Sequence, residues 1–324
     1  MFKVASLFSG CGGAECGLLG SFTFNEISYM ELPYEIVYAT DIDKKAIDTY
    51  KLNFECENVV VSDICDIHED AIPDHDILIG GFPCQSFSTV NPNKDPYDDR
   101  ANLYKEMVRI VQAKQPKVFI AENVKGFMTL KKGSIIQRVR DEFSNAGYNV
   151  STALLNAADY GVPQKRERVF LVGLRKDIDT KYKFPSPTTV DIPVPLSVAI
   201  PDLINVEEKY YFSQKAVQGM KNAKNNMKRG LAQKLDEPCL TVTSHLAKAS
   251  LNSRDPVLLV DPSKELYRRF TPREAARIQS FPESFLFAGS DLDAYRQIGN
   301  AIAPVMFWHI AKSVSDMLIS IDNA

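Results

Sequence analysis

The most constraining feature is the stretch GGFPCQSFS, residues 80–88, which interrupts a short apolar run at residues 76–79. That run is typical of a buried strand, and the two glycines and Pro83 end it, so Cys84 follows a strand end. In an open α/β sheet, ligands bind outside the carboxyl ends of the strands. A lone Cys is more often a small buried hydrophobe, but the polar run up to residue 102 favours exposure. The sequence therefore predicts that the Cys84 thiol meets a substrate.

Apolar runs and helical patterns alternate through the first half of the chain, which is typical of a doubly wound α/β sheet. The predicted strands span residues 3–8, 34–39, 59–61, 76–79, 117–121, 148–155 and 168–174. The predicted helices span residues 14–19, 44–53, 102–113 and 134–146. After Arg175 the alternation stops and prolines become frequent, which indicates a second, irregular region. A short strand is expected at residues 241–243 and a last amphipathic helix at residues 301–321.

Charge is unevenly distributed along the 324 residues, although the net charge is only −3. Residues 31–76 contain 13 acids against 3 lysines, whereas residues 209–235 contain seven Lys or Arg and no acid. A local basic surface can meet phosphates whatever the net charge of the protein. On charge alone, a solvated loop face explains the basic stretch equally well.

Six scattered cysteines form no C-x-x-C pair and the four histidines lie far apart, so neither a metal site nor a redox dithiol is predicted. No apolar run approaches the roughly 18 residues of a membrane span. The N-terminus lacks the long apolar core of a signal peptide. These features predict a cytoplasmic protein without membrane or metal.

A glycine-rich turn at residues 9–15 lies between the first strand and the first helix, a layout that lets the backbone approach a nucleotide. Glu15 stands where the dinucleotide fingerprint needs its last glycine, which disfavours a nicotinamide-dependent dehydrogenase. Asp41, after the second strand, suits a ribose diol, and Asp43 suits a helix cap. Asp63 suits either an adenine amine or a turn. Glu122, on the same sheet edge as Cys84, suggests a nucleophile and acid pair.

Together, these residues match one family. The motifs, in the family's order, are FSGCGG (8–13), DIDK (41–44), SDI (62–64), GFPCQSFS (81–88), ENV (122–124), QKRER (164–168), RRFTPRE (268–274) and QIGNA (297–301). The chain resembles a cytosine-5 DNA methyltransferase of the bacterial, restriction-modification type. The resemblance implies an S-adenosylmethionine-dependent methyltransferase fold, with a doubly wound mixed sheet and a smaller, irregular target-recognition domain. The implied domains are residues 1–188 plus 289–324, which hold catalysis and cofactor, and residues 189–288, which hold target recognition and a hinge.

The resemblance also implies the chemistry. Cys84 would add to carbon 6 of a flipped-out cytosine, because carbon 5 is otherwise too weak a nucleophile to take a methyl group. Glu122 would bind ring nitrogen N3 and the exocyclic amine, Arg168 the ring oxygen, and Arg166 would support the same site. Methyl transfer from S-adenosylmethionine, which leaves S-adenosylhomocysteine, needs no metal.

Other residues are assigned by the same resemblance. The expected cofactor-binding residues are Phe8, Gly10, Cys11, Gly12, Gly13, Asp41, Ile42, Asp63, Ile64, Pro83, Leu103, Asn300 and Ala301. The expected DNA-binding residues are Gln85, Ser88, Arg100, Lys221, Lys224, Lys228, Arg229, Thr241 and Thr243. Because Asn300 would close the cofactor pocket, the last helix must return to the first domain.

The expected partner is double-stranded DNA, read by a monomer, with a cognate restriction endonuclease acting on the same site without a stable complex. A same-fold transfer RNA methyltransferase would share the catalytic motifs, but the roughly 90-residue second region favours duplex DNA. Intact Cys84, Glu122 and Arg168 argue against a catalytically silent DNA-binding module. Two departures from the family pattern, Ala101 in place of Gly and the absence of Gly from residues 89–100, concern closure of the loop after Cys84.

Overall fold

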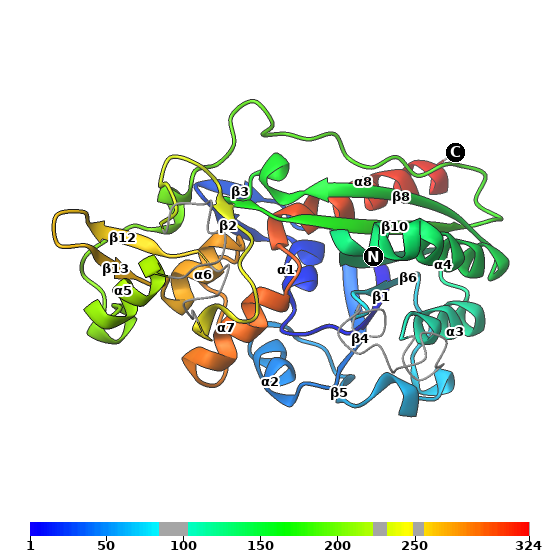
Figure 1. Ribbon diagram of the computed structural model, residues 1–324. Coiled ribbons are helices and arrows are strands. Elements are labelled where there is room, and N and C mark those ends of the chain that lie inside the picture. The colour runs from blue at the N-terminus through cyan, green and yellow to red at the C-terminus, as the bar shows by residue number, and fades with distance from the viewer. Residues whose placement is uncertain (84–102, 223–231, 249–255, 324) are drawn as a thin grey trace.

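A computed structural model describes residues 1–83, 103–222, 232–248 and 256–323 (Figure 1). Its centre is a seven-stranded sheet in the order β5-β4-β1-β6-β7-β10-β8. The strands are β1 (Phe2–Leu7), β4 (Tyr34–Asp41), β5 (Val59–Val61), β6 (Ile77–Gly80), β7 (Val118–Val124), β8 (Tyr148–Asn156) and β10 (Glu167–Arg175). The pairs from β5 to β7 are parallel, and β10 runs antiparallel to both of its neighbours. The predicted doubly wound, mixed α/β sheet is therefore confirmed.

Helices cover both faces of this sheet because its central strands are apolar on both sides. On β1, Val4 packs with α1 (Gly13–Leu19) and α8 (Pro304–Asp322), whereas Ala5 and Leu7 pack with α3 (Tyr104–Lys114) and α4 (Ser134–Asn145). The remaining helix of this part, α2 (Lys44–Asn53), follows β4, and Asp43 caps it by accepting from the amide of Lys45 at 2.9 Å. Asp43 therefore has the capping role expected from the sequence.

The order of the strands fixes where a ligand can bind. The chain passes from β1 to β4 on one side and later returns to β6 on the other side of β1. Such a switch point leaves a crevice outside the carboxyl ends of the two central strands. The glycine turn after β1 and the residues after β6, which lead to Cys84, border this crevice. The carboxyl-terminal parts of β4 and β7, which hold Asp41 and Glu122, border it as well.

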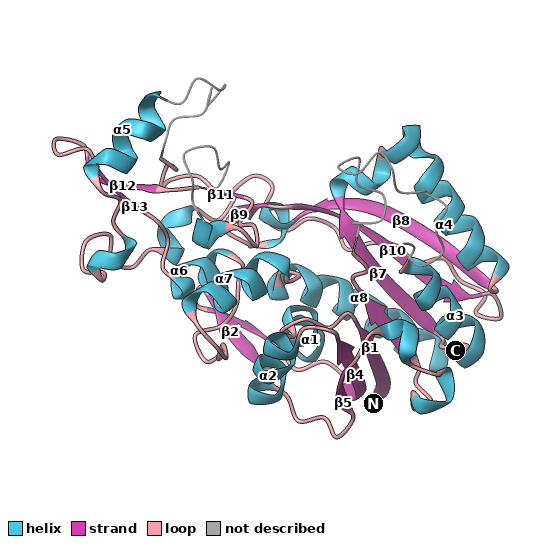
Figure 2. Ribbon diagram, turned by 60° about the horizontal axis from the view of Figure 1, so that its bottom comes forward, coloured by secondary structure: helices cyan, strands magenta, loops and turns pink. Residues whose placement is uncertain are grey.

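The second part of the chain has little regular structure and extends away from the sheet (Figure 2). Its elements are α5 (Gln214–Asn222), β11 (Cys239–Leu240), β12 (Leu258–Asp261), β13 (Leu266–Arg268) and α6 (Pro272–Ile278). Helix α7 (Asp291–Asn300) then leads back to α8, and the hairpin β2 (Phe22–Phe24) and β3 (Ile27–Tyr29) and the short β9 (Gln164–Lys165) are the other described strands. Buried residues of this part form a core that also includes Cys11 and Cys16 of the glycine turn and α1. The segments that border the crevice are thus tied to both parts of the chain.

Most predicted boundaries shift by one or two residues, and three differences bear on the site. The last helix begins at Pro304 rather than at residue 301, because Ala301 and Ala303 are extended and a residue before proline avoids the helical region. The short strand lies at residues 239–240 rather than 241–243, since only that part pairs with β9. Strand β7 continues through Val124, so Glu122 lies within the strand.

Among the described helices, none is both long and apolar enough to cross a membrane.

Candidate active site

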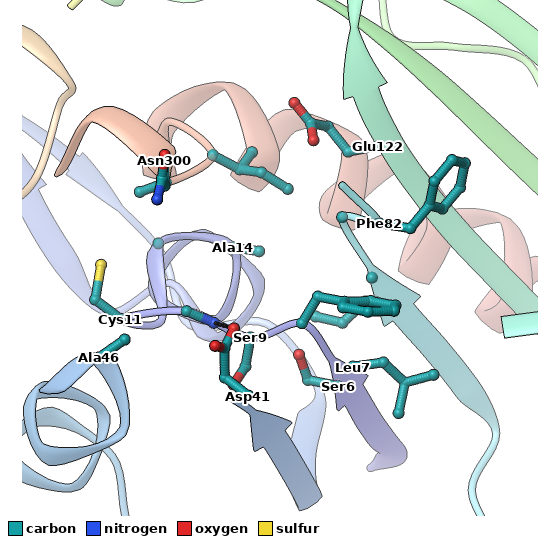
Figure 3. Close-up of a pocket in the computed structure, with 18 of the residues that line it drawn as sticks. Ser6, Leu7, Ser9, Cys11, Ala14, Asp41, Ala46, Phe82, Glu122 and Asn300 are labelled. Atoms are coloured by element: carbon teal, nitrogen blue, oxygen red, sulfur yellow. Dashed lines mark hydrogen bonds between the residues drawn. The ribbon is translucent and has the colours of Figure 1, made fainter. Parts of the chain in front are cut away.

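A cavity of about 370 Å³ lies at the switch point (Figure 3). Its walls come from the ends of β1, β4, β6 and β7, from α1, and from the junction of α7 with α8. Two ends can be distinguished. The Asp41 end contains Gly10, Glu15 and Asp41, and the Glu122 end contains Glu122, Arg166 and Arg168. Figure 3 shows Asp41 and Glu122 on opposite sides of the cavity.

Asp41 is held by backbone amides rather than by a cation. One carboxylate oxygen accepts from the amide of Gly10 at 2.8 Å, and the other accepts from the amide of Asp43, also at 2.8 Å. Burial raises the pKa of Asp41, and these two amides partly offset that rise. Gly10 has a φ of +56°, in the left-handed region where glycine is favoured, so its amide reaches Asp41 without steric strain.

Glu15, one turn into α1, is fully buried beneath the same end. The hydroxyl of Ser6 on β1 donates to its Oε1 at 2.5 Å, whereas its Oε2 has no hydrogen-bond partner in the described part of the chain. Burial raises the pKa of Glu15 to about 7. In the sequence, Glu15 served only as an argument against a nicotinamide cofactor. The structure shows that Glu15 lines the cavity.

Glu122 and Arg168 form the centre of the other end. Strands β7 and β10 pair Phe170 with Glu122 and Arg168 with Val124, so Glu122 and Arg168 are diagonal neighbours on one face. Nε of Arg168 lies 2.8 Å from Oε1 of Glu122, and both side chains are only 12% exposed. Burial raises the pKa of Glu122, and the charges of Arg168 and Arg166 partly offset this rise. Such a carboxyl group is suited to share a proton with a neutral base.

The backbone that leads to Cys84 is fixed from the same strand. The side-chain amide of Asn123 donates to the carbonyl of Phe82 at 2.9 Å, and both residues are buried. A Cβ on Gly81 would stand 3.2 Å from Oε2 of Glu122, so glycine leaves room for the carboxylate. Cys84, Gln85, Ser88 and Arg100 lie outside the described residues, and their predicted roles rest on the sequence.

Arg166 connects three segments that are far apart in sequence. Its guanidinium donates to the carbonyls of Val242, Gly299 and Ala301 at 2.9–3.0 Å, and the side chain is 1% exposed. The side chain of Gln164 accepts from the amide of Val242 at 2.8 Å. Gly299 permits this contact, because a Cβ there would lie 2.2 Å from the backbone of Thr243. Arg166 therefore acts in the structure as a clamp between the Glu122 end and residues 242–243.

The predicted cofactor residues divide into two groups. Those that line the cavity are Phe8, Gly10, Cys11, Gly13, Asp41, Ile42, Pro83, Asn300 and Ala301. Gly12, Asp63, Ile64 and Leu103 are outside its lining. Gly12 has a φ of +93°, and Asp63 accepts from the amide of Cys65 at 3.0 Å, as a turn residue does. Ile42 is 68% exposed, so its apolar surface is available to a flat ligand.

The predicted DNA-binding residues are only partly described. Lys224, Lys228 and Arg229 lie outside the described residues, and Lys221 is on α5, with no side-chain description. The hydroxyl of Thr241 donates to the carbonyl of Lys165 at 2.8 Å, and that of Thr243 accepts from the amide of His245 at 3.2 Å.

The basic stretch is less uniformly positive than its composition indicates. Lys209 pairs with Glu207 at 3.2 Å and with Asp291 at 3.0 Å, and Lys234 pairs with Glu237 at 2.8 Å. The three acids lie outside residues 209–235, so the charge of that stretch alone does not include them.

Several residues near the site gave no clear signal in the sequence. Asn123, Gln164 and Gln297 are buried amides whose hydrogen bonds fix backbone or side chains of distant segments. Gln297, for example, accepts from the hydroxyl of Thr49 on α2 at 2.6 Å. Each of the three lies inside a motif (ENV, QKRER or QIGNA) in which other residues were predicted to be functional. Among the described residues, no group of three or more His, Cys, Asp or Glu side chains is arranged to hold a metal ion.

This fold and site match a known family. The family model for C-5 cytosine-specific DNA methylases matches residues 2–316, and the chain belongs to that family. It is 36% identical to the Type II methyltransferase M1.ScrFI of Lactococcus lactis subsp. cremoris over 98% of this chain and 79% of the relative. It is 34% identical to the Type II methyltransferase M.NlaX of Neisseria lactamica over 100% of this chain and 99% of the relative. The resemblance noted in the sequence is thus confirmed, and the chain is a DNA (cytosine-5-)-methyltransferase.

Solved structures support the fold independently. The Dnmt2 methyltransferase of S. pombe superimposes with a TM-score of 0.76 at 20% identity, covering 99% of this chain and 100% of that one. A DNMT2 mutant from Spodoptera frugiperda gives 0.76 at 22% identity, covering 100% of both chains. At these identities the similarity shows the fold alone.

Proposed function

We propose that this enzyme transfers a methyl group from S-adenosylmethionine to carbon 5 of a flipped-out cytosine in one short double-stranded DNA sequence, through a covalent bond from Cys84 to carbon 6. The observation that carries the proposal is the buried Glu122–Arg168 pair, which shares one cavity with Asp41 and Gly10. One end therefore offers an acid and a cation to a heterocycle, while the other offers a carboxylate to a nucleoside.

The Glu122 end is suited to bind and activate cytosine. The raised pKa of Glu122 lets its carboxyl share a proton with N3, and the guanidinium of Arg168 attracts the ring oxygen. When Cys84 adds to carbon 6, negative charge develops on the ring, and the proton held between Glu122 and N3 offsets it. Carbon 5 then forms a bond to the methyl group while the bond between that methyl group and the sulfonium sulfur breaks, which leaves S-adenosylhomocysteine. Loss of the carbon 5 proton to a base restores the double bond and expels the Cys84 thiolate.

The Asp41 end fits S-adenosylmethionine, which supplies an electrophilic methyl group when bound. Asp41 would accept from the two ribose hydroxyls, as its amide-fixed carboxylate allows. The exposed side chain of Ile42 would cover one face of the adenine. Gly13, where a Cβ would stand 2.5 Å from the carbonyl of Ile302, keeps α1 close to the Asn300 segment and so shapes the wall of the cavity.

Target recognition is assigned to residues 189–288, with residues 1–188 and 289–324 forming the catalytic domain. A cytosine within a duplex must be rotated out of the stack to enter a cavity of this size. The Arg166 clamp supports this division of roles, because it holds residues 242–243 beside the Glu122 end. We propose that the basic stretch contacts DNA phosphates and that neighbouring loops read base edges in the major groove. We also propose that a cognate restriction endonuclease acts on the same site without a stable complex; the names of the relatives, Type II methyltransferases, are consistent with such a pairing.

A transfer RNA substrate is the second candidate, since the catalytic motifs alone would serve either nucleic acid. The family match and the Type II methyltransferase relatives favour DNA.

Covalent trapping tests the mechanism directly. Duplex DNA containing 5-fluorocytosine carries no proton at carbon 5, so the enzyme should remain attached after methyl transfer. We expect a DNA-linked band on a denaturing gel with the wild type and S-adenosylmethionine, and none with Cys84→Ser. Equal trapping of both proteins would contradict the role of Cys84. Trapping on 5-fluorocytosine-containing transfer RNA, with none on DNA, would favour the second candidate.

A further inference from the structure

Among the described residues, four acidic side chains line the cavity, and three of them have a clear partner. Glu122 pairs with Arg168 at 2.8 Å, and Asp43 pairs with Arg296 at 3.1 Å. Asp41 accepts from two backbone amides and remains available to a ribose. Glu15 is the fourth, and within the described part of the chain it forms no ion pair.

The surroundings of Glu15 offer it little compensation. Its Oε1 accepts from Ser6, its Oε2 has no described partner, and the side chain has no solvent exposure. Its position in the first turn of α1 places it near free helix amides, but a seven-residue helix offsets only part of a buried charge. The titratable groups that act on it electrostatically, or on which it acts, are Cys11, Cys16, Asp41, Tyr50 and Cys56. None of these is a cation.

A buried carboxylate without a cation favours a ligand that brings one. S-adenosylmethionine carries a carboxylate, an ammonium and a sulfonium, so it has a net positive charge. S-adenosylhomocysteine has lost the sulfonium and is neutral overall. Ribose, adenine, carboxylate and ammonium are common to both, so contacts with those groups do not tell substrate from product.

We propose that Glu15 supplies the negative charge by which this cavity prefers S-adenosylmethionine over S-adenosylhomocysteine. The proposal rests on the proposed function, since it takes S-adenosylmethionine as the ligand of the Asp41 end. It gives Glu15 a role that Asp41 does not share. Asp41 holds a group present in both ligands, whereas Glu15 senses the charge that disappears during the reaction and so favours release of the product.

The preference should depend on pH. The pKa of Glu15 is raised to about 7, so the carboxylate is ionised above that pH and protonated below it. Preference for S-adenosylmethionine should therefore increase as pH rises from 6 to 8.5. The sulfonium lowers the pKa of the ammonium in S-adenosylmethionine, and loss of that proton would weaken binding of this ligand as pH rises. Titration of the ammonium therefore acts against the expected increase and cannot produce it.

Calorimetry with both ligands tests the proposal. The proteins are the wild type, Glu15→Gln, which keeps the acceptor for Ser6 but removes the charge, and Asp41→Asn, the matched control. At pH 8.5 we expect Glu15→Gln to weaken S-adenosylmethionine about tenfold more than S-adenosylhomocysteine, since a charge in a low-dielectric site is weakly screened. Asp41→Asn should weaken both ligands alike.

The outcomes are distinguishable. An equal loss for both ligands in Glu15→Gln, or no loss, would overturn the role of Glu15. If Glu15→Gln does not fold, the wild-type ratio of dissociation constants between pH 6 and pH 8.5 decides instead: an increase in preference supports the proposal and a flat ratio contradicts it. Failure of the wild type to bind either ligand would contradict the proposed function itself.

Discussion

The carboxylates at the two ends of the cavity have different kinds of partner. At the Glu122 end, the carboxyl is paired with Arg168 before any ligand arrives, and Arg166 lies close enough to act on it. At the Asp41 end, the described partners of Asp41 are backbone amides, and the described partner of Glu15 is the hydroxyl of Ser6 on one oxygen. Both carboxyl groups that are central to these ends, Glu122 and Asp41, have a pKa raised by burial.

This difference indicates which kind of ligand each end is suited to bind. A buried acid already paired with arginine suits a neutral ring, because no further charge has to be compensated until the reaction begins. A buried acid without a described cation, as Glu15 is, suits a ligand that is itself positive. The arrangement of charge thus matches cytosine at one end and S-adenosylmethionine at the other.

The largest predicted effect separates chemistry from cofactor binding. Glu122→Gln keeps the shape of the side chain but cannot share a proton with N3. We expect the rate of methyl transfer to fall about 10²- to 10³-fold, while the dissociation constant for S-adenosylmethionine changes less than about twofold. Single-turnover transfer of tritiated methyl groups and calorimetry measure the two quantities. A parallel loss of cofactor affinity would show that the two ends are not independent.

A smaller effect is expected at the other end. Asp41→Ala removes the acceptor for the ribose hydroxyls and for the amide of Gly10. Affinity for S-adenosylmethionine and S-adenosylhomocysteine should fall alike, about tenfold to a hundredfold, as expected for hydrogen bonds to a charged acceptor. Transfer at saturating cofactor should remain close to the wild-type rate. Unchanged affinity in calorimetry would remove Asp41 from the ribose site.

The smallest predicted effect concerns the basic stretch, residues 209–235. Replacing Lys221, Lys224, Lys228 and Arg229 together by Gln should weaken DNA binding about fivefold to tenfold at ~0.15 M salt and flatten its salt dependence. Cofactor binding should not change.

The matched control for this variant is Lys209→Gln with Lys234→Gln, because ion pairs with acids already neutralise these two lysines. This control variant should change the dependence of DNA affinity on salt concentration much less than the fourfold variant does. Equal slopes for the wild type and the fourfold variant, measured by fluorescence anisotropy on one duplex, would show that the basic stretch does not face phosphates.

Much of the fold was predictable because local signals agreed with it. The start of α6, for example, carries a capping box of Thr271 and Glu274 with Pro272 at the first helical position, a pattern that can be read from the sequence. Helix α7 begins with the same kind of signal, Ser290 followed by Asp293, although the sequence prediction included no helix there. The boundary errors arose where pairing with a distant segment decides the structure, as β9 does for residues 239–240.

The sequence predicted that Glu122 and Arg168 share one site, because both belong to motifs of the family it resembles, and the structure places them together. The site was not predictable where the role depends on a partner far away in sequence. Arg166 was expected to support the cytosine site, but its bonds to Val242, Gly299 and Ala301 could not be inferred from a local pattern. Glu15 was similarly hidden, because only the fold shows that it is buried beside Ser6 without a cation.

The central claim is sequence-specific methylation of cytosine carbon 5 in DNA, and one measurement tests it most directly. The purified enzyme is incubated with S-adenosylmethionine and unmethylated genomic DNA, and 5-methylcytosine is mapped by bisulfite sequencing, with Cys84→Ser as the control. We predict methylation confined to a single short sequence context and none with Cys84→Ser. Absence of 5-methylcytosine from DNA treated with folded, cofactor-binding enzyme would contradict the account.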